Sequence, residues 1–518
     1  MSDSEAASHS NRGFRTNPHG GHEEALLTEE SEPPGSSLRH PFWHDVPDPL
    51  WNDWRWQSQH SIRTVEQLEK LLVFTEEELV ALRTLQSQYK LAIPPYYFSL
   101  IDPADPADPI RLQSVASPLE LFSRSGDEED DPLDEDKDSP VPGLTHRYPD
   151  RVLLVTTHVC TMYCRFCTRK RATMKRGGWD AVSHDDERMI DYIRCHPEIH
   201  DVIVSGGDPL TLPLAKLEFF LQSLKEIDHV GVVRIGTRVP VTLPMRLYEE
   251  ELVRLLEDTG KVWIQTHFNH PREVTPEAAR VCRRLLEGGM PINNHAVLLK
   301  GVNDSVATMR RLCRALLRIK VRPYYLFHCD PVTGAGHFRT TVWKGLEIME
   351  GLRGHISGLG VPTYVVDAPR GGGKIPLMPN YLVSASDASV VLRNYEGVLI
   401  RYNADGRPSA AEPAFDTQGV SELLEGGREV LVPEGNPRMA RRRKLALSRK
   451  PRTPGPTPRK ATAMPLVAKT NGKRPTGNGA AAAVKRAQNP ANGDSPAAQF
   501  PLFELVAAAP DNSPEVPV

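Results

Sequence analysis

The chain has 518 residues, of which 39% are hydrophobic and 25% are charged, and its 63 Lys and Arg nearly balance its 66 Asp and Glu. The apolar fraction lies below the usual range of globular domains and 46 residues are proline, which predicts two or three domains with part of the chain disordered. Apolar runs such as 152–155 are too short to cross a bilayer, and the polar, acidic residues 1–12 do not resemble a secretory signal, so the sequence excludes membrane and secreted proteins and predicts a cytoplasmic location.

The N-terminal part predicts disorder followed by helices. Residues 1–40 are rich in Ser, Glu, Gly and His without an apolar period, and we expect them to be disordered. Residues 41–145 are expected to be mainly helical, because Thr64 and Thr75 are each followed three residues later by Gln or Glu, which is the signature of a capping box. Residues 127–138 hold nine carboxylates in twelve positions, which predicts a solvated acidic loop.

Residues 146–402 alternate between short apolar runs and amphipathic stretches, and are expected to form the catalytic core. The expected strands are residues 152–156, 202–205, 230–237, 262–266, 292–299, 323–327 and 363–367. The expected helices are residues 217–226, 244–257, 276–286 and 306–317. This repetition predicts an α/β protein with a parallel sheet, either open and doubly wound or a full or partial (β/α) barrel. Both architectures place functional residues at the C-terminal ends of the strands.

The remaining residues give a weaker signal. Residues 403–435 are expected to form an extension of the core, and residues 436–518 a basic, low-complexity, disordered tail. The stretch from Arg438 to Lys460 contains ten Lys and Arg and no acid. Such a stretch can bind the phosphates of RNA or DNA, although a solubilising extension is the more common role of such tails.

The strongest chemical signal is the segment from Cys160 to Cys167, which holds three of the seven cysteines in the spacing C-x-x-x-C-x-x-C directly after the first expected strand. Three thiolates at this spacing can bind three irons of a [4Fe–4S] cube and leave the fourth iron open to a small molecule. The alternative is a zinc site with His158 as the fourth ligand. Because a zinc site usually has a second Cys or His pair, which is not visible here, we favour the iron–sulfur cluster.

Two glycine-rich segments follow other expected strands. Residues 205–208 read Ser-Gly-Gly-Asp, and Gly371 to Gly373 directly precede Lys374. Glycines allow a bound group to approach the backbone closely, although many turns use glycine only for its backbone conformation. A lysine that forms a Schiff base needs a neutral amine, which partial burial favours by lowering the pKa. By itself, a lysine in such a segment is more often an exposed residue of a flexible loop.

Together these segments resemble the lysine 2,3-aminomutase family, whose members are radical S-adenosylmethionine (SAM) enzymes that also use pyridoxal 5′-phosphate. The similarity runs from about residue 147 to residue 402. It includes residues 148–151 (Tyr-Pro-Asp-Arg), 164–171, 266–271, 301–304, 337–339 and 392–397.

The resemblance implies a role for each candidate site residue. It implies that Cys160, Cys164 and Cys167 are the cluster ligands, and that SAM is bound by Ser205, Gly206, Gly207, Asp208 and His267. It implies that Lys374 is the catalytic lysine that holds pyridoxal phosphate as a Schiff base, with Arg147 and Arg151 near the cofactor phosphate. For the substrate, it implies that Arg169 binds the carboxylate and that Asp330 and Asp367 bind a distal ammonium. Two carboxylates in one partly buried pocket repel each other and require a cation between them, which favours a substrate with a terminal amine.

The implied reaction is the interconversion of L-lysine and L-β-lysine by 2,3-amino migration. The implied partners are free lysine, an electron donor of the flavodoxin or ferredoxin class and further copies of the chain in a homo-oligomer, without nucleic acid or membrane. One alternative is a related aminomutase acting on arginine, ornithine or glutamate. Another is an iron–sulfur protein that binds nucleic acid through residues 438–460.

Three positions depart from the family pattern. Ser305 stands where relatives with a structural zinc carry a cysteine, and no cysteine follows Cys329, so the resemblance does not extend to a zinc-linked oligomer. His295 replaces a glutamine expected near the cofactor, and Arg370 replaces a glycine of the segment before Lys374.

Overall fold

The computed structural model describes residues 39–122, 126–176, 185–386, 389–403, 432 and 435–448, all of which belong to one compact unit spanning residues 1–451. Nearly all of the lead predicted for residues 1–40, most of the extension predicted for 403–435 and the tail after residue 448 lie outside the described residues. Within these ranges, every helix falls short of the length and hydrophobicity that a membrane crossing needs.

The centre of the described structure is a nine-stranded sheet whose strands neighbour one another in sequence order. Its strands are β1 (Leu144–Tyr148), β2 (Arg151–Thr157), β3 (Asp201–Gly206), β4 (Val232–Gly236), β5 (Val262–Thr266), β6 (Ile292–Leu298), β7 (Arg322–His328), β8 (Thr363–Ala368) and β9 (Gly373–Pro376). Strands β2 to β8 run parallel, and β1 and β9 pair antiparallel at the two ends. Sequential order excludes the doubly wound alternative, in which the strand order reverses, and confirms a partial (β/α) barrel.

The two ends of the barrel sheet meet without forming a ladder. The backbone N–H of Lys374 in β9 donates a 2.9 Å hydrogen bond to the hydroxyl of Tyr148 in β1. A Cβ built on Gly373 would lie only 3.1 Å from the same hydroxyl oxygen. The gap between β1 and β9 is therefore bridged by a side chain directly beside Lys374.

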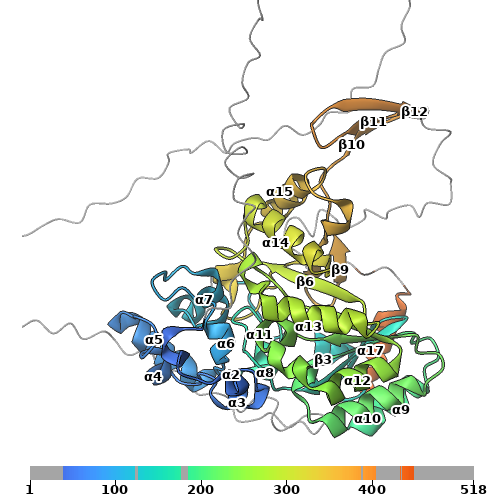
Figure 1. The fold of residues 1–518 in the computed structure, drawn as a ribbon. Coiled ribbons are helices and arrows are strands. Elements are labelled where there is room, and N and C mark those ends of the chain that lie inside the picture. The colour runs from blue at the N-terminus through green and yellow to red at the C-terminus, as the bar shows by residue number, and fades with distance from the viewer. Residues whose placement is uncertain are drawn as a thin grey trace, which may run out of the picture. The chain divides into compact units, whose positions relative to one another are not determined.

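Helices cover the outside of the sheet (Figure 1). They are α9 (Asp186–Arg194), α10 (Leu214–Lys225), α12 (Glu250–Thr259), α13 (Pro276–Glu287), α14 (Val306–Arg318) and α15 (Val342–Leu352), with a short α11 (Val239–Thr242) after β4. Each presents an apolar face to the strands; in α10, for example, Leu217, Phe220 and Leu224 are fully buried. Thr275 and Ser305 cap α13 and α14 by accepting hydrogen bonds from backbone amides of the first turn.

The seven strands expected from the sequence are all present, each within two residues of the predicted ends. The helix expected over residues 244–257 is instead a 3₁₀ helix, η8 (Pro244–Tyr248), followed by α12, because Glu249 between them adopts an extended backbone. The sequence analysis missed β1 and β9, whose five and four residues are mostly polar, glycine or proline and lack an apolar run.

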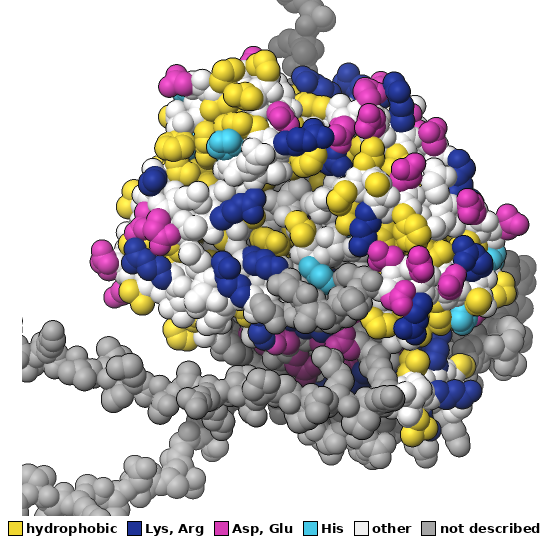
Figure 2. Space-filling view, turned by 90° about the horizontal axis from the view of Figure 1, so that it is seen from below, with side chains coloured by type: hydrophobic (Ala, Val, Ile, Leu, Met, Phe, Trp, Pro, Cys, Tyr) yellow, Lys and Arg dark blue, Asp and Glu magenta, His cyan; other side chains and the backbone are white. Residues whose placement is uncertain are grey.

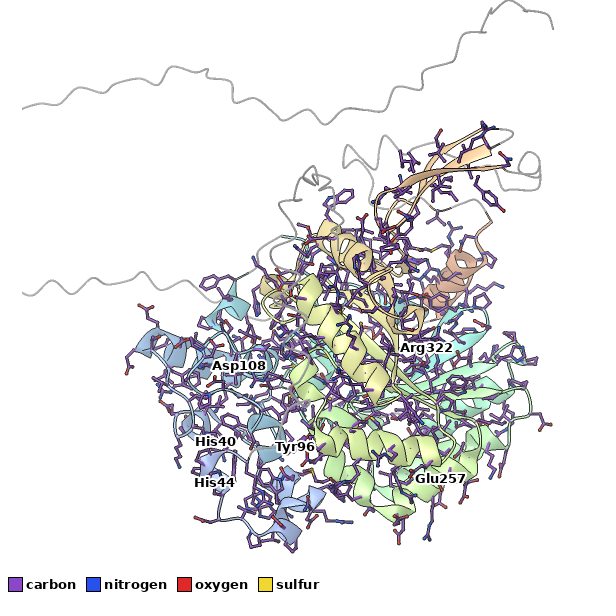
Figure 3. All side chains as sticks on the ribbon, turned by 45° about the horizontal axis from the view of Figure 1, so that its top comes forward. His40, His44, Tyr96, Asp108, Glu257 and Arg322 are labelled. Atoms are coloured by element: carbon purple, nitrogen blue, oxygen red, sulfur yellow. The ribbon has the colours of Figure 1, made fainter. Side chains whose placement is uncertain are left out.

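The N-terminal region is helical, as expected. It contains α2 (Asp48–Trp51), α3 (Trp54–Gln59), α4 (Val65–Leu68), α5 (Glu76–Gln88), α6 (Pro95–Phe98) and α7 (Pro109–Ser114). Thr64 and Thr75 form the two predicted capping boxes. Figure 3 shows Tyr96 and Asp108 on this region, where they join it to the barrel: the Tyr96 hydroxyl pairs with that of Thr275, and Asp108 forms an ion pair with Arg272.

The acidic loop at residues 127–138 is solvated only in part: Asp127, Glu129 and Asp130 are exposed as predicted, whereas the later carboxylates are paired and partly or fully buried. Asp138 is only 1% exposed and forms ion pairs with Arg147 at 2.9 Å and with Arg442 at 2.6 Å. Other carboxylates of the loop form ion pairs with the basic run at residues 165–176. The prediction fails because it considered the acids of residues 127–138 alone, whereas the fold places a basic segment opposite them.

The predicted disordered tail begins too early, because residues 437–448 form a helix, α17 (Pro437–Ser448). Arg442 binds both carboxylate oxygens of Asp138, and Arg438 donates to the backbone oxygen of Gly371. These contacts hold α17 against the acidic loop and against the glycine segment that precedes Lys374.

A second, three-stranded antiparallel sheet consists of β10 (Leu382–Ala385), β11 (Ser389–Arg393) and β12 (Leu399–Asn403).

Candidate active site

A cavity of about 400 Å³ lies at the C-terminal ends of the barrel strands. The structure brings all fourteen sequence-predicted site residues to its wall: Arg147, Arg151, Cys160, Cys164, Cys167, Arg169, Ser205, Gly206, Gly207, Asp208, His267, Asp330, Asp367 and Lys374. They come from the loop after β2, from the ends of β3, β5 and β7, and from β1, β2, β8 and β9. The barrel topology therefore gathers residues that lie up to 227 positions apart, from Arg147 to Lys374, while their individual roles stay predictions.

The three cysteines stand at one side of this cavity with unfavourable mutual electrostatics. Burial raises the pKa of the Cys160 and Cys167 thiols, and the charges of the other cysteines in the loop raise both further. A bound cationic centre reverses this cost because it stabilises deprotonated thiolates. In the described part of the chain, no three His, Cys, Asp or Glu side chains converge on one point as a single zinc ion requires. The thiolates of a cube each bind a different iron, and three cysteines of one loop fit this donor set.

Buried ion pairs and a backbone hydrogen bond to the N-terminal region fix the conformation of the cysteine loop. Arg165 and Lys170 both pair with the carboxylate of Glu120, at 2.6 and 2.7 Å, and all three side chains are at most 2% exposed. Although burial by itself would raise the pKa of Glu120, the two cations lower it to about 2. The backbone N–H of Arg165 also donates to the carbonyl oxygen of Gln113 in α7. The N-terminal helices thus fix the conformation of the predicted cluster loop.

The Ser-Gly-Gly-Asp segment needs its glycines for steric reasons. Gly206 has a φ of +119°, and a Cβ on it would lie 2.4 Å from the carbonyl oxygen of Thr157. A Cβ on Gly207 would lie 2.3 Å from the carbonyl oxygen of Val159. Only glycine therefore lets this segment pass directly against the start of the cysteine loop. The Asp208 carboxylate accepts hydrogen bonds from the Thr237 hydroxyl and the Arg238 amide, so it organises the loop after β4.

Buried polar atoms without a partner point to a ligand in this half of the cavity. Among the described residues, Gln265 Oε1, Thr266 Oγ1 and His267 Nε2 are buried and have no hydrogen-bond partner. All three residues line the cavity, and the His267 ring stacks on Phe166 with the centroids 5.6 Å apart. Burial and the charge of Arg238 lower the pKa of His267 well below its usual value, so the imidazole is neutral. Buried polar atoms are normally satisfied, so these three fit a polar ligand such as SAM.

The other half of the cavity contains Lys374 and two aspartates. Lys374 Nζ lies 2.8 Å from Asp367 Oδ2, and the second oxygen of Asp367 is buried without a partner. Asp330 accepts a 2.6 Å hydrogen bond from the Thr168 hydroxyl. Burial, together with the charge of Asp367, raises the pKa of Asp330 to about 6. The two carboxylates thus share one pocket whose cation is the lysine amine.

Arg169 is engaged with a residue that the sequence analysis did not single out. Its Nε and Nη2 atoms bind the two carboxylate oxygens of Glu135 at 3.1 and 2.8 Å. Such a planar two-point pair fixes the orientation of the guanidinium. The only sequence signal for Glu135 was its place in an acidic run, which indicates charge but no partner. Arg147 is similarly fixed by Asp138, and the guanidinium of Arg151 lies over the Tyr148 ring.

The three positions that depart from the family pattern have local explanations. Ser305 caps α14 through its hydroxyl. Arg370 has a φ of +57°, in the left-handed region where glycine is usual, and its backbone N–H binds the Pro132 carbonyl oxygen. His295 lies in the cavity wall with Nε2 buried and unpartnered, and burial lowers its pKa to about 3, so it is neutral.

Comparisons with known proteins agree with this geometry. The profile of the Lysine-2,3-aminomutase family matches residues 349–455, and that of the Radical SAM superfamily matches residues 154–313. The chain is 49% identical to L-lysine 2,3-aminomutase of Clostridium subterminale over 408 residues, which cover 77% of this chain and 97% of the relative. It is 48% identical to the enzyme of the same name from Acetoanaerobium sticklandii, with 78% and 99% covered. It is also 46% identical to glutamate 2,3-aminomutase of Clostridioides difficile, with 71% and 84% covered.

Proposed function

Because this chain belongs to the lysine 2,3-aminomutase family of radical SAM enzymes, we propose that it interconverts L-lysine and L-β-lysine by moving the amino group between C2 and C3. Membership makes the chain an isomerase that uses a [4Fe–4S] cluster, SAM and pyridoxal 5′-phosphate. Since the family also includes an enzyme named for glutamate, the choice of lysine rests on the chemistry of the cavity.

The observation that supports lysine is the contact of the Lys374 amine with Asp367 in a cavity that Asp330 also lines. A primary amine of the protein already lies at 2.8 Å from Asp367, and its positive charge also acts on Asp330. A substrate with a terminal ammonium would fit the same carboxylates. The side-chain carboxylate of glutamate would instead add a third negative charge to this pocket, at a large desolvation and repulsion cost. The pocket therefore favours lysine over glutamate.

The residues that line the cavity fit the three cofactors that the family uses, which are the cluster, SAM and pyridoxal phosphate. When bound, the cluster with SAM supplies a carbon radical, and pyridoxal phosphate carries the migrating amino group. Cys160, Cys164 and Cys167 would hold the cluster, and Lys374 would hold pyridoxal phosphate near Arg147 and Arg151. Arg169, oriented by Glu135, would bind the substrate carboxylate. The barrel wall would exclude water while these groups keep the reacting atoms in contact.

The alternatives differ in substrate length and charge. Ornithine also has a terminal ammonium but one methylene fewer, so it would not bridge from Arg169 to the two aspartates as well as lysine. Arginine ends in a larger planar guanidinium. A flavodoxin- or ferredoxin-type electron donor and a homo-oligomer remain part of this proposal.

The nucleic-acid alternative rests on the basic stretch at residues 438–460, of which the structure describes residues 438–448. In the described part of the basic stretch, Arg438, Arg441 and Arg442 bind protein oxygens. Figure 2 shows one face of the molecule on which Lys and Arg side chains are interspersed with Asp and Glu.

The deciding experiment is anaerobic reconstitution with iron, sulfide, pyridoxal phosphate and SAM, followed by product analysis. Dithionite or a reduced flavodoxin would supply the electron. We expect β-lysine from lysine, with much lower turnover of glutamate, ornithine and arginine. Turnover of glutamate in preference to lysine would reject the substrate assignment. Failure to bind either iron or pyridoxal phosphate would reject the site assignment as a whole.

A further inference from the structure

The side chain of Arg238 reaches one of the three predicted cluster ligands from behind. Its Nη1 lies 2.8 Å from Cys164 Sγ. We infer that Arg238 is a positioning residue that donates a hydrogen bond to the Cys164 thiolate and thereby raises the reduction potential of the cluster. This inference rests on the cluster assignment in the proposed function, and it is independent of which amino acid is the substrate.

The remaining donors of Arg238 are occupied, so that only Nη1 is free to face the sulfur. The guanidinium is almost fully buried, with 9% of the side chain exposed. Its Nε donates to the His267 carbonyl oxygen at 3.1 Å. The two N–H groups of Nη2 donate to Glu273 Oε1 at 2.7 Å and Gln113 Oε1 at 2.7 Å, and the Tyr97 hydroxyl lies nearby at 3.3 Å. Each edge of the planar group thus has a separate partner.

The surroundings keep the guanidinium in this orientation. It lies 5.6 Å from the ring centroid of Tyr97 and 5.7 Å from that of Phe166, which belongs to the cysteine loop. The backbone N–H of Arg238 is bound by the Asp208 carboxylate at 2.8 Å. The side chain therefore cannot turn toward solvent without breaking contacts to α6, α7 and the loop after β5. This rigidity fixes the donor with respect to the sulfur.

The three cysteines differ in the hydrogen-bond donors that their sulfur atoms face. Cys167 Sγ has the Thr173 hydroxyl at 4.0 Å, the limit for a hydrogen bond to sulfur. For Cys160, the described residues provide no hydrogen-bond donor to the sulfur atom. Only Cys164 faces a charged donor. Arg169 places a second positive charge near Cys160 and Cys167, so the direct guanidinium hydrogen bond, rather than positive charge as such, distinguishes Cys164.

A charged donor at a cluster sulfur has a definite effect on redox properties. Reduction adds negative charge to the cluster, and a hydrogen bond to a ligating sulfur stabilises that charge. The countercharge of Arg238, Glu273, is fully buried and lies at the opposite edge of the guanidinium, where it also accepts from Tyr97 and from the Asn269 amide. The positive end of the pair therefore faces the sulfur. The arrangement makes the cluster easier to reduce, which helps a radical SAM enzyme accept its electron.

A purely structural ion pair would explain the contacts of Nη2 and Nε, because they join the N-terminal helices to the barrel. It would not place Nη1 on a sulfur atom. Stability measurements cannot separate the two roles, since loss of one partner of a buried ion pair destabilises any protein. The reduction potential can separate them, because a structural contact would not change it in a defined direction.

The test is an anaerobic redox titration of reconstituted, SAM-free protein, followed by electron paramagnetic resonance. The main variant is the double change Arg238→Gln with Glu273→Gln, which removes the donor without leaving an unpaired charge. We expect the midpoint potential to fall by about 59 mV. For a one-electron couple, this shift lowers the ratio of reduced to oxidised cluster at a fixed potential about tenfold. Glu273→Gln alone leaves Arg238 uncompensated and should shift the potential upward. Arg238→Lys keeps the positive charge but lacks the planar guanidinium with its several N–H donors, so its midpoint potential should lie between those of the wild type and the double variant.

Tyr97→Phe is the matched control, because it removes a contact of Nη2 and Glu273 and leaves Nη1 on the sulfur. It should lower stability without shifting the potential by a comparable amount. Equal potentials for wild type and the double variant, at full cluster content, would overturn the inference. If the double variant does not fold, a downward or absent shift in Glu273→Gln overturns it equally. Absence of any cluster in the wild type would instead reject the proposed function.

Discussion

The Nζ atom of Lys374 lies 2.8 Å from Asp367 Oδ2, so the residue predicted to hold pyridoxal phosphate is paired with one predicted to bind the substrate. If Nζ of Lys374 held the cofactor as a Schiff base, it would no longer be a free ammonium with three N–H donors, and Asp367 would lose that partner. Cofactor loading would therefore free the carboxylate that a substrate ammonium needs. This relationship makes substrate binding depend on the state of Lys374.

The first prediction follows from this pairing. Lys374→Met removes the amine while keeping an unbranched side chain, so pyridoxal phosphate should no longer be trapped by borohydride. Because Asp367 becomes unpaired, the cofactor-free variant should bind L-lysine about tenfold more tightly than cofactor-free wild type in calorimetric titrations. The exposed Lys300→Met is the control, with both properties unchanged. Continued trapping in Lys374→Met would show that another lysine holds the cofactor.

The second prediction concerns the ammonium pocket. Asp330→Asn removes one of the two carboxylates while keeping size and hydrogen bonding to Thr168. We expect kcat/KM for lysine to fall about a hundredfold, or about 2.7 kcal/mol, because a buried ammonium loses one counterion. The cluster signal should be unchanged. The exposed Asp228→Asn provides the control, and wild-type kinetics in Asp330→Asn would contradict the assignment.

The third prediction is a pH dependence of stability in the cofactor-free protein. Burial raises the folded-state pKa of Asp330 to about 6, whereas in the unfolded chain the pKa of an aspartate is about 3.9. Between these values the folded state binds more protons than the unfolded state, so stability falls as pH rises. The Asp330→Asn variant has no carboxyl group at this position and therefore does not lose this stability as pH rises. Its free energy of unfolding relative to wild type should therefore rise by about 1 kcal/mol between about pH 5 and pH 7.5 in urea titrations. A constant difference across this range would contradict the raised pKa.

The fourth prediction concerns Glu120, which neutralises Arg165 and Lys170 behind the cysteine loop. Glu120→Gln leaves two buried cations without a counterion and should lower the free energy of unfolding by about 3–5 kcal/mol. Because the pKa of Glu120 is lowered to about 2, this contribution should be complete above about pH 4.5 and lost only as pH falls toward 2. Urea unfolding measures it. The exposed Glu218→Gln should behave as wild type, and a similarly small effect at Glu120 would disprove the buried pairing.

The fifth prediction separates two arginines on α17. Arg442 binds Asp138, which is 1% exposed, whereas the next residue, Arg443, is exposed. Arg442→Ala should lower stability by about 1–3 kcal/mol through loss of charged hydrogen bonds to a buried acceptor. Arg443→Ala should change it by less than about 0.5 kcal/mol. Equal effects in thermal or urea unfolding would mean that α17 does not contribute through Asp138.

Local sequence patterns predicted much of the fold because they depend on neighbouring residues. Apolar runs located the seven parallel strands, and Thr64 and Thr75 located two helix starts. The same reasoning failed for the acidic loop and for α17, whose charges are satisfied by segments far away in sequence. In isolation, charge runs indicate solvent exposure, whereas in the folded chain Asp138 and Arg442 satisfy each other across about 300 positions.

The sequence by itself determined the cysteine spacing, the glycines that allow close backbone approach and the order of strands that carries each candidate residue to a strand end. Only the tertiary structure decided which side chains meet there. The antiparallel register of β8 and β9 places Lys374 beside Asp367, and the fold as a whole places Tyr148 beside Lys374, Glu135 on Arg169 and Arg238 on Cys164. These pairs depend on distances of a few ångströms between separate elements. Such distances follow from packing of the whole chain, because no local pattern of residue types encodes which buried charge will face which partner.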